Sequence, residues 1–310
     1  MFDKDFVWGC ATAAIQIEGA INEDKKAKSI WDVRNGTSVI KNHDKLDIAC
    51  DSYHRYLEDI ALLKKLGANA YRFSVSWVRI MDDNNEPILE GINYYHKVID
   101  ACLKNNITPF ITLYHWDLPE RYRKIGGWAS LQVVRDFVKF TEVVLKAYSS
   151  KVKHFITINE ISSSVDGSGN TYTLTQKEVE KTYPSYKEYL LSTHHLMLAH
   201  ALALKLIHKY HALGGYAASS TPCIPLTNSE EDIDAARKAY FDITKDDPYL
   251  SMSMQEDPVY LGKYPDIYFK VFTDEDRSLI NLDDLKTIAS EKVDFFCQNL
   301  YTSRFVKSDG

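Results

Sequence analysis

The residues of this sequence best suited to chemistry follow a β-branched run that ends in an amide and a carboxyl. The run 156–158 reads Ile-Thr-Ile and continues into Asn159 and Glu160. A carboxyl at the end of a buried strand is costly to ionise, so Glu160 could hold a proton near neutral pH and act as a general acid. A structural role is also open, because Glu160 could cap the following turn or pair with an arginine.

A second polar group, His115-Trp116-Asp117, follows another apolar run. This mixture suits a ligand rich in hydroxyl groups, because an aromatic ring can pack on the apolar face of a sugar while polar neighbours bind its hydroxyls. The alternative is structural: a core tryptophan, a turn-capping aspartate and a satisfied histidine. Gln16 stands where the end of a first strand is expected, and its amide could bond two adjacent hydroxyls.

Metal and nucleophile chemistry find little support in the sequence. The motifs H-E-x-x-H and G-x-S-x-G do not occur. His194 and His195 are adjacent, so their rings point to different faces of a helix and cannot share a metal ion. Residues 166–170 read Asp-Gly-Ser-Gly-Asn, without the regular ligand spacing of a calcium loop. We therefore expect no metal centre.

The positions of these polar residues depend on a repeated alternation of short apolar runs and longer segments with helical spacing. Such an alternation is typical of parallel strands covered by helices. It predicts strands within residues 6–14, 70–77, 108–114, 152–159, 215–219 and 293–301. It predicts helices over residues 51–66, 92–104, 131–148 and 186–210. Residues 228–290 are charged and weakly periodic, which indicates one helix and long loops.

Two α/β folds fit six strand–helix alternations: an open doubly wound sheet and a (β/α)8 TIM barrel. The polar residues fall within or at the carboxyl ends of different strands, which meet at one mouth in a barrel. These residues are Arg72, His115, Glu160, Asn299 and Tyr301. An open sheet would more often use a glycine-rich phosphate loop, and neither G-x-G-x-x-G nor G-x-x-x-x-G-K-[ST] occurs. The sequence therefore favours the barrel.

Length and composition describe a single domain, 1–310. The chain is 45% hydrophobic and 26% charged, and no linker or internal repeat divides it. A net charge of -6 argues against nucleic acid as a partner. The N-terminus has no apolar signal segment, and we expect no stretch of the roughly 18 apolar residues that a membrane span needs. Five cysteines without a C-x-x-C pair indicate reduced thiols. A cytoplasmic protein without a membrane partner is the expectation.

Eight ordered motifs together resemble the family-one glycoside hydrolases, the β-glucosidases and 6-phospho-β-glucosidases. They are FVWGCATA (6–13), IQIEG (15–19), SIWD (29–32), YRFSVSW (71–77), LYHWDLP (113–119), GGW (126–128), TINE (157–160) and NLYTS (299–303). Each motif alone is weak, but their order and spacing cover almost the whole chain. The resemblance implies a barrel that hydrolyses small β-glycosides with retention, through a covalent glycosyl-enzyme. It implies no cofactor, because both steps need only carboxylates.

The resemblance also implies roles for individual residues. Glu160 matches the general acid/base, and Asn159 matches the group that holds the sugar 2-hydroxyl. Three residues match positions that bind the non-reducing-end sugar: Gln16, His115 and Trp116. Arg72 and Tyr301 match the pair that orients the nucleophilic carboxylate, and Asn299 lies beside them.

The sequence departs from the family at the nucleophile. Retention needs a second carboxylate roughly 5 to 5.5 Å from the acid, which the family places in a Thr/Ser-Glu-Asn-Gly motif on the seventh strand. The 310 residues contain no Glu-Asn-Gly. We therefore expect an incomplete barrel of about six of the eight units, inactive alone, whose unpaired edges favour self-association or a complementing fragment. The alternative function is a non-catalytic sugar-binding remnant.

The substrate hints conflict. Ile161 after the acid is frequent in 6-phospho-β-glucosidases, whereas the His-Trp-Asp-Leu-Pro wording of residues 115–119 belongs to the plain β-glucosidases. A phosphate-binding Ser/Lys/Tyr loop discriminates the two in the family, and it would lie beyond residue 310. We favour the unphosphorylated glucoside, with the 6-phosphoglucoside as the alternative.

Overall fold

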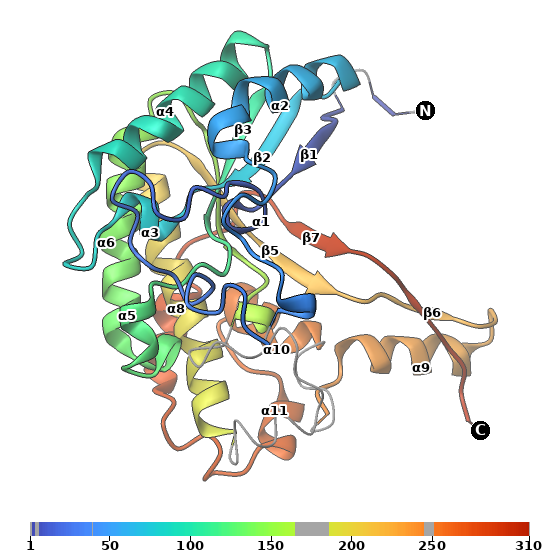
Figure 1. Cartoon of the computed structure of the whole chain (residues 1–310). Coiled ribbons are helices and arrows are strands. Elements are labelled where there is room, and N and C mark those ends of the chain that lie inside the picture. The colour runs from blue at the N-terminus through green and yellow to red at the C-terminus, as the bar shows by residue number, and fades with distance from the viewer. Residues whose placement is uncertain (1, 4–5, 39, 165–185, 245–250, 310) are drawn as a thin grey trace.

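A curled, six-stranded parallel sheet forms the centre of the protein in the computed structural model, which describes residues 2–3, 6–38, 40–164, 186–244 and 251–309 (Figure 1). The strand order is β1-β2-β3-β4-β5-β7, and every neighbouring pair is parallel. The strands are β1 (Gly9–Ala11), β2 (Ala70–Ser74), β3 (Thr108–Tyr114), β4 (His154–Asn159), β5 (Leu213–Ser220) and β7 (Cys297–Leu300). This sheet confirms the prediction of an incomplete barrel. Residues 166–170, considered above for calcium, lie outside the described residues.

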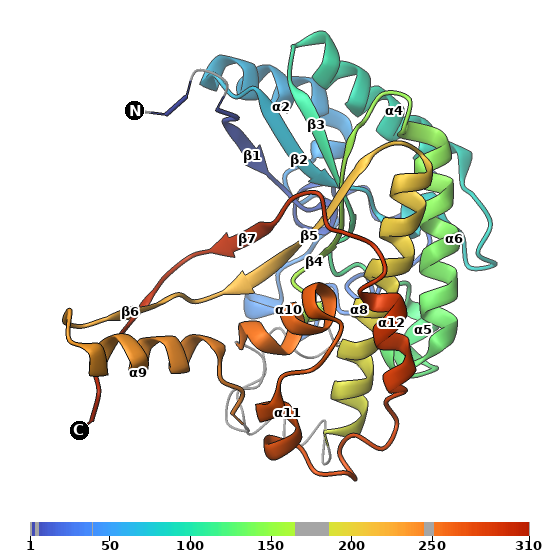
Figure 2. The ribbon, with the colours of Figure 1, turned by 180° about the vertical axis from the view of Figure 1, so that it is seen from behind.

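Four long helices cover the outer face of the sheet, as seen from both sides in Figures 1 and 2. They are α2 (Ser52–Leu66), α4 (Leu89–Lys104), α6 (Leu131–Tyr148) and α8 (Lys187–Lys209). Local signals set their ends. Helix α2 stops at Gly67, whose φ of 86° is left-handed and suits glycine. Helix α6 begins after Ser130, whose side chain accepts a hydrogen bond from the Gln132 backbone N–H.

The core between helices and sheet is densely aromatic. Trp77 stacks on Phe140 with ring centroids 5.2 Å apart, and Trp128 meets Tyr114 edge-on at 5.1 Å. All four side chains are almost fully buried. Such rings bury large apolar areas and fix helix α6 against the strands.

Several predicted boundaries are wrong in detail. Strand β1 has only three residues and leads into helix α1 (Ala14–Ile17), while β2 stops before helix α3 (Trp77–Ile80). Residues 228–290 are more helical than expected. They contain α9 (Glu230–Phe241), α10 (Met252–Leu261), α11 (Asp266–Val271), η4 (Leu282–Asp284) and α12 (Leu285–Ile288). The remaining short elements are η1 (Lys41–His43), α5 (Glu120–Arg123), η2 (Gly127–Ala129) and η3 (Ser162–Ser164).

Helix α8 corrects the expectation about membrane-spanning stretches. It is 23 residues long and apolar enough to cross a membrane by length and composition alone. However, 78% of its most apolar window is buried inside the protein. It packs against α6 and β5, so it serves here as a core helix.

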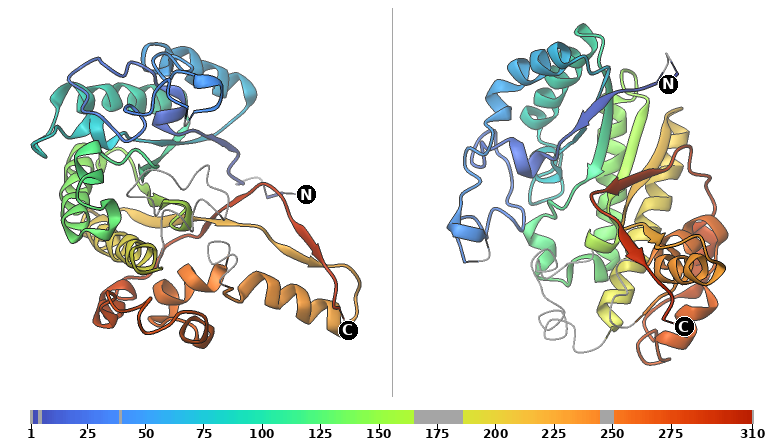
Figure 3. Two further views of the ribbon diagram at one scale, coloured as in Figure 1. Left: turned by 60° about the horizontal axis from the view of Figure 1, so that its bottom comes forward. Right: turned by 90° about the vertical axis from the view of Figure 1, so that its right-hand side faces the viewer.

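The sheet has two open edges among the described residues. Strand β1 pairs only with β2, and β7 pairs only with β5. Beside β1 and α2 lies an open apolar groove, whose lining includes Cys10, Ile17, Leu62, Leu63 and Leu66. Near the other edge, a second parallel pair of β6 (Cys223–Pro225) and β8 (Arg304–Val306) extends away from the sheet together with α9 (Figure 3).

Candidate active site

Glu160 lies directly after the end of β4 and is 4% exposed. Its backbone N–H donates to the Ala217 carbonyl on β5 at 2.6 Å, and its φ is 55°. The β4–β5 register shifts between Ile156 and Asn159, which re-aims the end of β4. A left-handed glutamate is uncommon and is held only by surrounding contacts, as is frequent at functional sites.

Hydrogen bonds from two other strands converge on Asn159 and Glu160. Asn299 on β7 donates through Nδ2 to Glu160 Oε1 at 2.5 Å and to Asn159 Oδ1 at 3.0 Å. Arg72 on β2 donates through Nη2 to the same Asn159 Oδ1 at 2.6 Å, and its Nη1 lies 3.5 Å from Asn299 Oδ1. Residues predicted from three separate motifs therefore form one connected network at the carboxyl ends of the strands.

Arg72 brings a fixed positive charge to this network. Its Nε donates to Thr112 Oγ1 on β3 at 2.9 Å, so the guanidinium bridges β2, β3 and β4. Burial lowers the pKa of Arg72, and the nearby Glu160, Cys297 and Tyr301 act in the opposite direction. Arginine keeps its proton in proteins, so the site holds a cation that would attract a carboxylate.

Two ring or amide nitrogens at this site have no protein partner among the described residues. Asn159 Nδ2 is buried and unpaired, although its Oδ1 accepts two hydrogen bonds. His115 Nδ1 is also buried and unpaired. Burial lowers the pKa of His115 to about 3, with a smaller contribution from Arg72, so the ring is neutral at physiological pH. Unpaired buried polar atoms are costly, and a hydroxyl-rich ligand would satisfy both.

Trp116 is half-buried and has a φ of 76°, also in the left-handed region. Its ring nitrogen donates to the Asn159 backbone carbonyl at 3.0 Å. The indole N–H therefore contacts the main chain beside Glu160.

Two predicted site residues lie apart from this network. Gln16 is exposed on helix α1, because β1 ends earlier than expected and the chain turns into that helix. Tyr301 is 88% exposed. It follows the last residue of edge strand β7, where nothing among the described residues packs on its outer side. Gln16 and Tyr301 therefore lie apart from the hydrogen-bonded network in this structure, and their roles at the site stay predictions.

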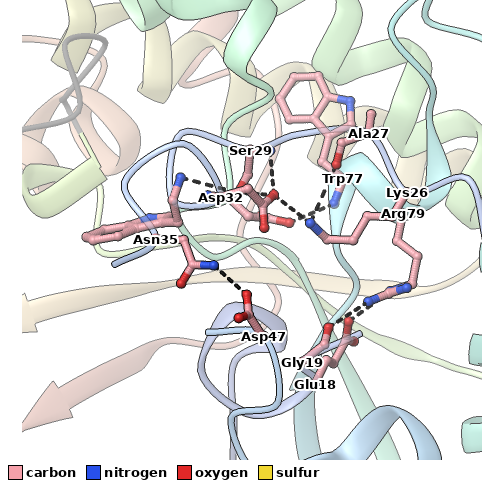
Figure 4. A network of polar contacts seen from close by, with 12 residues as sticks. Glu18, Gly19, Lys26, Ala27, Ser29, Asp32, Asn35, Asp47, Trp77 and Arg79 are labelled. Atoms are coloured by element: carbon pink, nitrogen blue, oxygen red, sulfur yellow. Dashed lines mark hydrogen bonds and ion pairs between the residues drawn. The ribbon is translucent and has the colours of Figure 1, made fainter. Parts of the chain in front are cut away.

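A buried ion pair near Gln16 escaped the sequence analysis. Arg79 is fully buried and donates through Nε to Glu18 Oε2 at 3.0 Å, while Tyr95 donates to Glu18 Oε1 at 2.6 Å (Figure 4). The guanidinium also stacks over the Tyr53 ring at 4.2 Å. The sequence held one signal for this ion pair, the carboxyl of Glu18 in the Ile-Gln-Ile-Glu-Gly motif. Residues two positions apart on a helical turn point to opposite sides, so Glu18 faces inward where Gln16 is exposed.

The histidine pair on α8 behaves as the sequence predicted. His194 Nδ1 lies 2.9 Å from the Tyr264 hydroxyl, and His195 Nδ1 lies 2.9 Å from the Trp128 carbonyl. The two rings therefore have separate partners. Among the described residues, no group of three or more His, Cys, Asp or Glu side chains could hold a metal ion.

The curled parallel sheet, with a buried carboxyl, an amide and an arginine at its carboxyl edge, together with the family match makes this chain a barrel-type O-glycosyl hydrolase. The chain belongs to glycosyl hydrolase family 1, whose family model matches residues 1–310. It is 35% identical to a 1,4-beta-D-glucan glucohydrolase of Thermotoga neapolitana and 37% identical to beta-glucosidase A of Acetivibrio thermocellus. Each match covers 99% of this chain and 70% or 67% of the relative. The solved family 1 β-glucosidase of Thermotoga maritima superposes with a TM-score of 0.83 at 32% identity, over 99% of this chain and 67% of that one.

Proposed function

We propose that the 310 residues carry the acid/base half of a retaining β-glucosidase. In the first step Glu160 protonates the glycosidic oxygen as the bond to the sugar breaks, and in the second it takes a proton from the attacking water. One observation supports this most directly: Glu160 is buried at the end of β4, with Asn299 donating to its Oε1.

The neighbouring residues suit the binding of the sugar. Asn159 has a fixed orientation, because Arg72 and Asn299 both donate to its oxygen, and this leaves Nδ2 to donate to a sugar hydroxyl. The neutral His115 can bind a second hydroxyl. Arg72 supplies positive charge for the second carboxylate that retention requires, which the family's Glu-Asn-Gly motif would bring from outside these residues.

The open edges suggest how that carboxylate is supplied. We propose that two further strand–helix units add to the free sides of β1 and β7, with a helix lying in the groove beside α2. This accords with the relatives, of whose length the chain covers about two thirds. The apolar groove beside α2 would then be buried, and both open edges of the sheet would be paired.

The decisive experiment measures hydrolysis of 4-nitrophenyl β-D-glucoside by the chain alone and after addition of a polypeptide carrying two such units with a carboxylate at the end of the first strand. We expect turnover only in the mixture. Glu160→Gln should abolish it, whereas Glu188→Gln, an exposed glutamate on α8, should not. A mixture without activity, or activity that survives Glu160→Gln, would contradict the proposal.

The same assay decides between plain and phosphorylated substrates. Ile161 is fully buried in the core, so its side chain does not present a substrate contact. The relatives reported above carry β-glucosidase names, and we therefore propose the unphosphorylated glucoside. Faster hydrolysis of 4-nitrophenyl β-D-glucoside 6-phosphate would favour the alternative.

A second candidate function is sugar binding without turnover, which the two unpaired nitrogens at Asn159 and His115 favour for the chain alone. Calorimetry with methyl β-D-glucoside would show heat of binding and no product. We also propose a cytoplasmic location, supported by five cysteines that are all free.

A further inference from the structure

We infer that Trp31 is a positioning residue for the acid Glu160, acting through Trp116. The inference rests on the proposed function for its purpose, but the geometry stands by itself. The indole N–H groups of Trp31 and Trp116 form two successive hydrogen-bonded contacts, here called the relay. It runs from the loop after α1 to the peptide group between Asn159 and Glu160. Neither the Ser-Ile-Trp-Asp motif nor the spacing of the two tryptophans suggests this connection.

The first contact of the relay links the loop after α1 to the loop after β3. Trp31 Nε1 donates to the Trp116 carbonyl at 2.9 Å. The two residues are 85 positions apart in the chain, so the bond is a tertiary contact. It fixes the carbonyl of a residue whose φ is 76°, a conformation that a tryptophan does not adopt without support.

The second contact reaches the acid. Trp116 Nε1 donates to the Asn159 carbonyl at 3.0 Å, and the Ser164 hydroxyl donates to the same oxygen at 2.8 Å. This carbonyl belongs to the peptide group that joins Asn159 to Glu160, whose own φ is 55°. Rotation of that peptide would turn the Glu160 side chain, so the relay restrains the acid's direction.

The loop that holds Trp31 is itself anchored. The Ile30 backbone N–H donates to the Leu118 carbonyl at 2.9 Å, which pairs the loop with the segment after Trp116. Figure 4 shows Asp32 at the centre of a polar cluster, where it accepts from Lys26 Nζ at 2.5 Å and from the Ser29 hydroxyl at 2.8 Å. The Lys26–Asp32 pair is almost fully buried, so the base of the relay is rigid.

The relay can be tested by spectroscopic measurements that need no sugar ligand. Trp31→Phe removes the first donor and keeps an aromatic ring, while Trp31→His keeps a ring N–H. Trp8→Phe is the matched control, because Trp8 is exposed and packs on Phe2 and Phe6 at the N-terminus. The measurements are the indole N–H resonances of the five tryptophans and the hydrogen exchange of the Glu160 backbone amide, which bonds to Ala217.

With Trp31→Phe we expect the Trp116 indole resonance to shift and exchange at the Glu160 amide to become roughly two- to tenfold faster, as the loss of one hydrogen bond predicts. Trp31→His should restore most of the protection. In a Trp116→Phe background the second link is already absent, so adding Trp31→Phe should change the exchange of Glu160 little further. Should Trp31→Phe fail to fold, Trp116→Phe tests the second link of the relay with the same readout.

The inference is overturned if Trp31→Phe leaves both signals as they are in Trp8→Phe, or if the effects of Trp31→Phe and Trp116→Phe add independently. A separate titration with the iminosugar 1-deoxynojirimycin tests the purpose of the relay. We expect its affinity to fall by a similar factor in Trp31→Phe. If the protein completed by the two added strand–helix units binds none while the spectroscopic effects are present, the proposed function is contradicted and the relay is upheld.

Discussion

The side-chain amide of Asn299 donates to Glu160 Oε1 at 2.5 Å, although the two residues belong to strands that are not neighbours in the sheet. Strand β5 lies between them. The bond crosses the mouth of the curled sheet and ties edge strand β7 to the acid after β4. This hydrogen bond therefore couples the ordering of edge strand β7 to the orientation of the Glu160 side chain.

Replacement of Asn299 tests this coupling. Asn299→Ala removes the hydrogen bonds to Glu160 Oε1 and Asn159 Oδ1 and should destabilise the protein by about 1–3 kcal/mol, because each buried hydrogen bond contributes roughly 0.5–1.5 kcal/mol. Hydrogen exchange should rise at β7 and at the end of β4 together. Gln298→Ala is the control, since Gln298 donates to the Tyr240 hydroxyl on the other face of the same strand. Equal effects of both variants at Glu160 would refute the coupling.

Arg72 should not tolerate lysine. Its guanidinium donates to Thr112 and Asn159 at once, and a single ammonium cannot reproduce that fork. We expect Arg72→Lys to cost about 1–3 kcal/mol in the free energy of unfolding and to lower the activity of the completed protein at least about tenfold. Denaturant unfolding and glucoside hydrolysis measure the two effects. Arg55→Lys on the exposed face of α2 should change neither, and an unaffected Arg72→Lys would contradict the role given to the fork.

His208 should make stability depend on pH near neutrality. Burial lowers its pKa, but hydrogen bonds with Glu291 at 2.8 Å and Asp294 at 3.0 Å outweigh that effect and raise the pKa above 6.5. A raised histidine pKa stabilises the fold fully below about 6.5 and loses that contribution as pH rises through the folded value. We expect the free energy of unfolding to fall between pH 6 and pH 8. His208→Gln should remove this loss and Lys209→Gln should not; a loss that persists in His208→Gln would disprove the assignment.

The sequence predicted elements best where local signals are strong. Helix α6 and strand β3 have the predicted bounds, because apolar spacing and the Ser130 cap define the first and a β-branched run the second. Residues 228–290 were predicted poorly, since their helices are short and charged and depend on tertiary packing.

The candidate site was predictable in membership but not in geometry. Glu160, Asn159 and Arg72 could be proposed from motifs at strand ends. The bond between Asn299 and Glu160 spans 139 positions and depends on a fold-wide curl of the sheet, which no local pattern encodes. Likewise the position of Gln16 on helix α1 could not be predicted, because the point where a strand ends depends on its neighbours rather than on its own sequence.

Glu256 offers a second, independent test of pH dependence. It lies on α10, accepts a hydrogen bond from the buried Tyr216 hydroxyl of β5, and its Oε1 is buried without a partner among the described residues. Burial raises the pKa of Glu256 to about 7 from 4.5, with Tyr216 acting in the opposite direction. The folded protein then holds a proton that the unfolded chain releases, so stability falls as pH rises from 4.5 to 7.

Glu256→Gln should remove this loss, because the amide oxygen can still accept from Tyr216 and no charge is buried at any pH. We expect the variant to be more stable than the wild type at pH 8, by up to about 3 kcal/mol, and similar to it at pH 4.5. Denaturant unfolding across that range gives the difference, with Glu231→Gln on exposed α9 as the control. A Glu256→Gln protein that loses stability with pH as the wild type does would show that the carboxyl is already ionised and solvated in the fold.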